Sequence, residues 1–328
     1  MRVLFAALAS VGHTYPLIPL ALAARAAGHE VHFAVGEGVH APLAANGLRP
    51  FRPADSFYEI YAEDLEPELA RLEPDLVVHE WGVPGAAVAA RKAGIPGIWH
   101  GFGRMFPDGI GLESPAKAVP GRPHVDICPP SLQDKGFLAA EDRIELRPVP
   151  YSEPGPSPTV DGPLVYLTLG TAFGTADLLT TVIKGLATLD AYVVVATGRV
   201  RVDELGDLPH NVTARPWVSQ ADLVPRAAVV VHHGGSGTTL GALAAGVPQL
   251  VLPQGADQFA NAEAIVGVGA GLRLLADELG ADAVAEHVRT LSARHDHRDA
   301  ARAVAEEIAR MPSPDEVARR LPDYAQRP

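Results

Sequence analysis

The chain has 328 residues, a formal net charge of −12 and no block of lysines or arginines. This length allows two domains that each bury a core, and the acidic balance argues against nucleic acid or an anionic membrane surface as the main partner. Cys128 is the single cysteine, so an internal disulfide and a cysteine-based zinc cluster are excluded. We expect a cytoplasmic protein that binds a small molecule.

The first 30 residues contain an arginine and an apolar run, as a signal peptide does, but His13, Tyr15, Pro16 and Pro19 interrupt the run. This pattern predicts a β-strand followed by a helix, with no targeting segment and no membrane span. Short β-branched runs such as RVLFAALA, VHFAV and PDLVVHE then alternate with alanine-rich helical stretches. Such alternation indicates parallel βα units in a doubly wound sheet.

A proline- and glycine-rich stretch at residues 147–163 forbids a continuous helix or a central strand and predicts a boundary between domains. The alternation of strands and helices restarts after it with LVYLTLG, AYVVVATG, AAVVVHH and PQLVLP. The predicted fold class is therefore α/β, with two Rossmann-like, doubly wound domains. The expected divisions are a first domain at 1–150, a linker at 151–162, a second domain at 163–311 and a C-terminal helix at 312–328.

The charged tail from about residue 281 is predicted to be helical, and Ser313 with Pro314 marks the start of the last helix. His295 and His297 also lie in this tail, within the sequence RHDHRD. Histidines two positions apart on a helix diverge, so we interpret them as part of a solvated face and predict no metal site.

A glycine turn connects the predicted strand AAVVVHH to the next predicted helix. The backbone N–H groups of Gly235, Ser236, Gly237 and Thr238 would point outward from the start of this helix, which is a favourable place for an anion. His233, at the end of the strand, could add a hydrogen bond or a charge. The turn lacks the spacing of a P-loop or a nucleophile elbow. By itself, the pattern also fits an ordinary tight turn. The turn after the first strand, ASVGHT, has one glycine and lacks the dinucleotide fingerprint, which disfavours a nicotinamide cofactor.

Residues 215–262 favour the anion site over an ordinary turn, because they contain W-x-x-Q, H-x-G-x-G-T and D-Q in this order. This arrangement resembles the donor-binding signature of nucleotide-sugar-dependent glycosyltransferases of the two-domain GT-B fold, in their antibiotic and natural-product branch. The resemblance covers most of the chain. It implies that two Rossmann-like domains face each other across a cleft and that the C-terminal helix crosses back to the first domain.

In this family the nucleoside would be held by three residues of the second domain. The resemblance implies that Trp217 stacks on the base, that the backbone of Val218 reads the base edge, and that Gln220 faces the nucleoside sugar. Trp217 could instead be core packing. Many UDP-sugar members carry a glutamate for the ribose hydroxyls where this chain has Gly241, which favours a dTDP-sugar donor. Gly241 could also serve helix packing alone.

The resemblance also implies which residues hold the diphosphate and the transferred sugar of the donor. His233, the amides from Gly235 to Thr238, and Thr171 would hold the diphosphate. Asp257 and Gln258 would bond hydroxyls of the transferred sugar, which we expect to be a deoxysugar. The alternative for Asp257 is a helix N-cap. No D-x-D sequence occurs in the chain, so neither a bound metal nor a separate cofactor is expected.

Two residues of the first domain are candidates for catalysis. His13 follows the first strand at the carboxyl edge of the sheet, where open α/β folds place their chemistry, and the resemblance gives it the role of general base. Glu80 follows the fourth strand and could orient His13. The expected reaction is a single in-line displacement that inverts the configuration of the sugar. His13 as a helix cap and Glu80 as a solvated residue are the alternatives.

The first domain looks shorter than is usual in this family, where insertions wall the acceptor site. We predict that Trp81, Phe102, Met105 and Phe106 line an apolar acceptor cleft between the domains, with core packing as the alternative. The acceptor would be a natural product such as a polyketide. Two other functions stay open, a nucleotide-sugar epimerase of the same fold and a non-catalytic auxiliary subunit. The sequence also leaves open whether the protein forms a homodimer.

Overall fold

The computed structural model describes residues 1–105, 123–140, 142–153, 158, 162–171 and 173–326. Contacts divide the chain into two units, which are described separately. The N-terminal unit comprises Met1–Tyr151 and Arg310–Pro328, and the C-terminal unit comprises Ser152–Ala309. Within the described ranges, none of the helices has both the length and the apolar character needed to cross a membrane.

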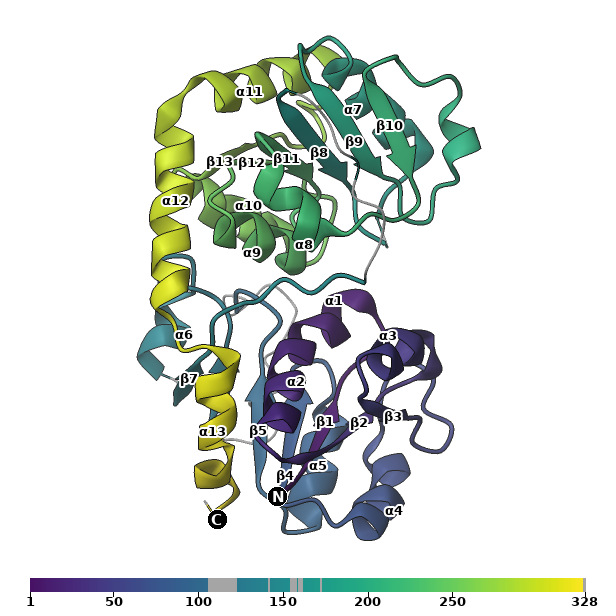
Figure 1. The fold of residues 1–328 in the computed structure, drawn as a ribbon, viewed down its shortest axis with the longest axis vertical. Helices are drawn as coiled ribbons and strands as arrows, with labels where there is room; N and C mark the ends of the chain where they lie inside the picture. The colour runs from purple at the N-terminus through teal and green to yellow at the C-terminus, as the bar shows by residue number, and fades with distance from the viewer. Residues whose placement is uncertain (106–122, 141, 154–157, 159–161, 172, 327–328) are drawn as a thin grey trace. The chain divides into compact units, whose positions relative to one another are not determined.

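The N-terminal unit is built on a seven-stranded parallel sheet in the order β3-β2-β1-β4-β5-β6-β7 (Figure 1). Its central strands are apolar and buried on both faces, as expected of a parallel sheet covered by helices. The start of the chain is thus a strand followed by a helix, as predicted. The strands are β1 (Arg2–Ala6), β2 (Glu30–Ala34), β3 (Arg49–Phe51), β4 (Leu76–Glu80), β5 (Gly97–His100), β6 (His124–Asp126) and β7 (Arg143–Glu145).

The helices of this unit include the last one of the chain. Ser313 and Glu316 form the capping box that starts α13 (Pro314–Ala325), with Pro314 in the first turn, and α13 packs against α2 (Figure 1). The other helices are α1 (Val11–Thr14), α2 (Ile18–Ala26), α3 (His40–Ala45), α4 (Ala62–Leu72), α5 (Pro84–Lys92) and α6 (Lys135–Ala140), with short 3-10 helices η1 (Tyr15–Leu17) and η2 (Glu37–Val39).

The C-terminal unit repeats this plan with a six-stranded parallel sheet in the order β10-β9-β8-β11-β12-β13. The strands are β8 (Leu164–Thr168), β9 (Tyr192–Ala196), β10 (Val212–Arg215), β11 (Val229–His232), β12 (Gln249–Val251) and β13 (Gly271–Arg273). The helices are α7 (Ala176–Leu186), α8 (Gln220–Leu223), α9 (Ser236–Ala244), α10 (Gln258–Gly267), α11 (Ala281–Ala293) and α12 (His295–Arg310), with 3-10 helices η4 (Val202–Leu205) and η5 (Val224–Arg226). The two parallel sheets confirm the predicted fold class.

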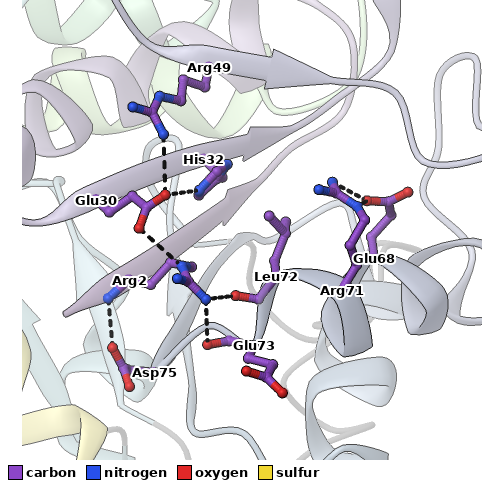
Figure 2. Close-up of polar contacts among 9 residues, drawn as sticks. All are labelled: Arg2, Glu30, His32, Arg49, Glu68, Arg71, Leu72, Glu73 and Asp75. Atoms are coloured by element: carbon purple, nitrogen blue, oxygen red, sulfur yellow. Dashed lines mark hydrogen bonds and ion pairs between the residues drawn. The ribbon is translucent and has the colours of Figure 1, made fainter.

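An exposed polar network holds the amino edge of the first sheet (Figure 2). The guanidinium of Arg2 donates to the carbonyl oxygens of Leu72 and Glu73 at the end of α4 and to the carboxylate of Glu30 at 3.2 Å. The carbonyl groups at a helix end have no partner within the helix, so Arg2 supplies one. The carboxylate of Glu30 also contacts His32 and Arg49. These contacts lie where the strands begin, opposite to the edge where open α/β folds carry out chemistry.

Two buried histidines belong to the core of the N-terminal unit. Burial lowers the pKa of His100 to about 4, although its Nδ1 contacts the carbonyl oxygen of Gly101 at 2.7 Å. Burial is also the main cause that lowers the pKa of His124 to about 3. Both imidazoles are therefore neutral in the folded protein near pH 7.

These lowered pKa values predict that the folded state loses stability in acid. Below pH 6.5 the unfolded chain takes up protons on both imidazoles, whereas the folded chain takes them up only near pH 4 and pH 3. The unfolding free energy of both proteins should fall between pH 7 and pH 5. We expect this fall to be about 2 kcal/mol smaller in His100→Asn than in the wild type. Urea titrations at both pH values measure this difference. Equal losses in the two proteins would contradict the prediction.

Candidate active site

His13 and Glu80 meet at the carboxyl edge of the first sheet. Because β1 and β4 are parallel neighbours, the segment that follows β1 lies beside the end of β4. The Nδ1 atom of His13, on α1, lies 2.9 Å from Oε1 of Glu80, whose side chain has no exposed surface. The Thr14 hydroxyl donates to the carbonyl oxygen of Leu8 at 2.8 Å and anchors α1. The structure thus brings the predicted pair together. The neighbouring His79 packs its ring against Trp99 instead.

Aromatic rings surround this pair on one side. The rings of His13 and Phe102 have centroids 4.7 Å apart, and those of Phe102 and Trp81 have centroids 5.6 Å apart. Met105 is buried at 7% exposure and donates its amide N–H to Gln133 at 2.9 Å, which favours a packing role for its side chain. The fourth predicted acceptor residue, Phe106, lies outside the described residues. Two of the four therefore form an apolar surface next to the imidazole of His13.

The glycine turn of the C-terminal unit follows β11, and α9 begins directly after it. The first hydrogen bond within α9 joins the N–H of Thr239 to the carbonyl oxygen of Gly235. The amides of Ser236, Gly237 and Thr238 precede this bond, so they are the donors that a helix leaves for an anion. No group of three or more His, Cys, Asp or Glu residues in the described part of the chain is arranged to hold a metal ion.

His233 lies between two glycines. A Cβ atom at Gly170 would stand 2.6 Å from Cε1 of His233, and one at Gly235 would stand 2.6 Å from its Nε2. Both glycines therefore make room for the imidazole ring. Burial lowers the pKa of His233 to about 4, and a hydrogen bond to the carbonyl group of Thr168 opposes this shift in part. Near pH 7 the free protein presents His233 as a neutral imidazole, and the bond to Thr168 uses its one ring N–H.

Asp257 and Ser236 connect the start of α10 to the start of α9. The hydroxyl of Ser236 donates to Oδ2 of Asp257 at 2.8 Å, and Nδ2 of Asn261 donates to the same oxygen at 2.9 Å. Asp257 occupies the N-cap position of α10, but its side chain does not cap the helix. The two predicted donor residues are thus joined by a direct hydrogen bond.

Gln258 has partners within its own loop, whereas Thr171 contacts the loop after β9. The buried Gln258 accepts, through Oε1, the amide N–H groups of Gln254 at 2.8 Å and Gly255 at 3.2 Å. Its carboxamide oxygen therefore holds the loop before α10. Thr171 is exposed, and its carbonyl oxygen accepts a hydrogen bond from Nε of Arg199.

The residues predicted to hold the nucleoside lie just before α8 or begin it. The hydroxyl of Thr238 donates to Oε1 of Gln220 at 3.2 Å, which links the first turn of α9 to the start of α8. Val218 is buried in an apolar cluster, so its side chain belongs to the core of this unit. Trp217 is half-buried, and its Nε1 has no hydrogen-bond partner in the part of the chain that is described.

Three polar residues around the glycine turn were not among the predicted site residues. His232 accepts the N–H of Gly234 and contacts Gln249, and Asn261 donates to the carbonyl oxygen of Gly234. The sequence held a signal for His232, because it is a polar residue at the end of an apolar strand, next to the glycine turn. Asn261 lies four positions after Asp257, on the same helix face, which was a signal for their contact.

The sequence is similar to that of known glycosyltransferases. The family model described as "Erythromycin biosynthesis protein CIII-like, C-terminal domain" matches residues 180–323. L-demethylnoviosyl transferase of Streptomyces niveus is 33% identical over 377 aligned positions, which cover 98% of this chain and 97% of that protein. Elloramycin glycosyltransferase ElmGT of Streptomyces olivaceus is 33% identical over 385 positions, with 98% and 97% covered. Both alignments exceed the 328 residues of this chain, so each relative has stretches that this chain lacks.

The fold is also similar to that of solved glycosyltransferases. The structure of spinosyn rhamnosyltransferase SpnG complexed with thymidine diphosphate aligns with a TM-score of 0.84 and 25% sequence identity. This alignment covers 98% of the present chain and 100% of that one.

Proposed function

The chain belongs to the family of antibiotic-pathway glycosyltransferases that includes the erythromycin biosynthesis protein CIII-like proteins, and we propose that it moves a sugar from a thymidine diphosphate sugar to a hydroxyl of an apolar natural product. The observation that supports this chemistry best is the 2.9 Å contact between His13 and the buried Glu80. A histidine oriented by a carboxylate is suited to take a proton from a hydroxyl.

The N-terminal unit would supply the base. With Nδ1 of His13 bound to Glu80, Nε2 accepts the proton of the acceptor hydroxyl. The acceptor oxygen then forms a bond to the anomeric carbon, while the bond from that carbon to the diphosphate oxygen breaks. Attack opposite to the leaving group inverts the sugar. The buried Glu80 stabilises the imidazolium that forms, and the rings of Phe102 and Trp81 offer an apolar surface to the acceptor.

The C-terminal unit would hold the donor. The amides of Ser236, Gly237 and Thr238, with the partial positive charge of the start of α9, meet the charge that develops on the leaving diphosphate. A bound diphosphate would favour the charged form of His233, which has a second N–H to donate to it. Because these groups are fixed before the reaction, we propose that transfer needs no bound metal.

Removal of His13 should abolish catalysis and spare donor binding. For His13→Ala we expect a fall in kcat of about 10²–10⁴-fold with the Kd for thymidine diphosphate unchanged, because the base acts only in the chemical step. Glu80→Gln should lower kcat less. Mass spectrometry of the glycosylated product, with a panel of thymidine diphosphate sugars and polyketide acceptors, measures the rate.

His32→Ala is the matched control for this experiment. It also removes a histidine paired with a glutamate, because His32 lies 3.0 Å from Glu30 at the opposite edge of the same sheet (Figure 2). We expect it to retain wild-type kcat. A His13→Ala protein as active as the control would refute the assignment of the base.

The donor nucleotide should be thymidine diphosphate rather than UDP. Gly241 stands where many UDP-sugar members have a glutamate for the ribose hydroxyls, and 2′-deoxyribose lacks one of these hydroxyls. We therefore expect calorimetry to give a Kd for thymidine diphosphate that is equal to or lower than the Kd for UDP. Much tighter binding of UDP would show that the donor is wrongly assigned.

A methyl group at position 170 should displace the ring of His233. Gly170→Ala brings Cβ to 2.6 Å from this ring, so we expect weaker binding of thymidine diphosphate, by about tenfold. The residue also has φ +71°, which strains alanine by about 1–2 kcal/mol. Gly269→Ala is the control, because Gly269 has φ +77° after α10 in the same unit, and a Cβ there would meet only Ala300 at 3.6 Å. If both variants lose affinity equally, backbone strain and not the ring contact is responsible.

A further inference from the structure

Both polar groups of the Gly234 backbone are held by buried side chains. Its N–H donates to Nδ1 of His232 at 3.1 Å, and its carbonyl oxygen accepts from Nδ2 of Asn261 at 2.9 Å. The side chains of His232 and Asn261 have 0% and 3% exposure. This arrangement fixes the peptide groups on both sides of Gly234, one residue before the start of the anion-binding turn.

The protonation of His232 is determined by its partners. Because Nδ1 accepts the N–H of Gly234, the ring proton is on Nε2, which donates to Oε1 of Gln249 at 2.7 Å. Burial, with a contribution from the neighbouring His233, lowers the pKa of His232 to about 3, so this neutral form is kept. Gln249 lies on β12, the strand beside β11, so the sheet itself sets the orientation of the ring.

Asn261 extends the same support to the helix start. Its Nδ2 also lies 3.1 Å from the hydroxyl oxygen of Ser236 and 2.9 Å from Oδ2 of Asp257. One amide group thus contacts the turn, the first residue of α9 and the residue before α10. A shift of α10 would therefore move the first turn of α9 with it.

Gly234 itself cannot adjust easily. Its φ of +96° disfavours other residues, and a Cβ there would stand 2.9 Å from Val251 Cγ1 and 3.0 Å from the carbonyl oxygen of Gln258. We propose that His232 and Asn261 are positioning residues that hold Gly234 in this conformation and thereby aim the amides of the α9 start at the donor diphosphate. The part of this inference that concerns the diphosphate rests on the proposed function.

Two amide substitutions at position 232 test the role of the ring. Asn places its carboxamide oxygen as many bonds from Cα as Nδ1, so His232→Asn keeps an acceptor for Gly234 and loses the bond to Gln249. His232→Gln keeps a donor for Gln249 and loses the acceptor. We expect His232→Gln to weaken thymidine diphosphate binding about tenfold and His232→Asn to change it less than threefold. Equal effects of the two variants would overturn the assignment.

The test of Asn261 uses a second asparagine as its control. Asn261→Asp replaces the donor with a carboxylate that faces the carbonyl oxygen of Gly234 and the carboxylate of Asp257, so we expect binding to weaken at least tenfold. Asn211 donates to the carbonyl oxygens of Leu189 and Ala191 before β10, at the other edge of the sheet. Asn211→Asp should lower the melting temperature and leave the affinity unchanged. Similar affinity losses in both variants would contradict the proposal.

Amide hydrogen exchange separates this inference from the proposed function. In the full chain without ligand, the segment 229–240 should exchange faster in His232→Gln and Asn261→Asp than in the wild type and His232→Asn. Unchanged exchange in the first two variants refutes the positioning role whatever the chain binds. Failure of the wild type to bind thymidine diphosphate, with exchange as expected, refutes the proposed donor and the part of the inference that concerns the diphosphate, and leaves the support of Gly234 established.

Discussion

The contact between His13 and Glu80 is the constraint on which the proposed chemistry of the N-terminal unit depends. A carboxylate without solvent exposure at the end of a buried strand is unfavourable unless an N–H group meets it. The parallel pairing of β1 with β4 brings the segment that carries His13 to that place. A carboxylate that would be a liability elsewhere becomes the group that orients the imidazole. The topology of the sheet and the chemistry of the pair are therefore explained together.

In the proposed function, the C-terminal unit would meet the diphosphate with uncharged groups. The amides at the start of α9, the hydroxyl of Thr238 and the imidazole of His233 are uncharged in the free protein. Gln220 holds the hydroxyl, and Gly170 and Gly235 flank the imidazole. Fixed dipoles would suit a diphosphate that is bound and released in each cycle of the proposed reaction, because they need no counter-charge without the ligand. The proposed function thus gives two units of the same architecture different electrostatic tasks.

Much of the fold could be predicted from the sequence. The β-branched runs gave the strands because a parallel sheet buries both faces, and Ser313 with Pro314 gave the start of the last helix because capping is a local property. The contacts of the site could not be predicted in the same way. Gln258 turns its oxygen to its own loop, and Asn261 reaches Gly234 across 27 positions. Such contacts depend on how separate elements pack, which no local pattern encodes.

The place of α13 has a consequence for engineering the chain. The N-terminal unit is discontinuous, since Arg310–Pro328 belongs to it together with Met1–Tyr151. A chimera that exchanges the C-terminal unit with that of a relative therefore needs two junctions, one between residues 151 and 152 and one between 309 and 310. A single crossover would give the first half a foreign α13 against its own α2. To recombine units within this family, the C-terminal unit must therefore be inserted into the N-terminal unit rather than fused to its end.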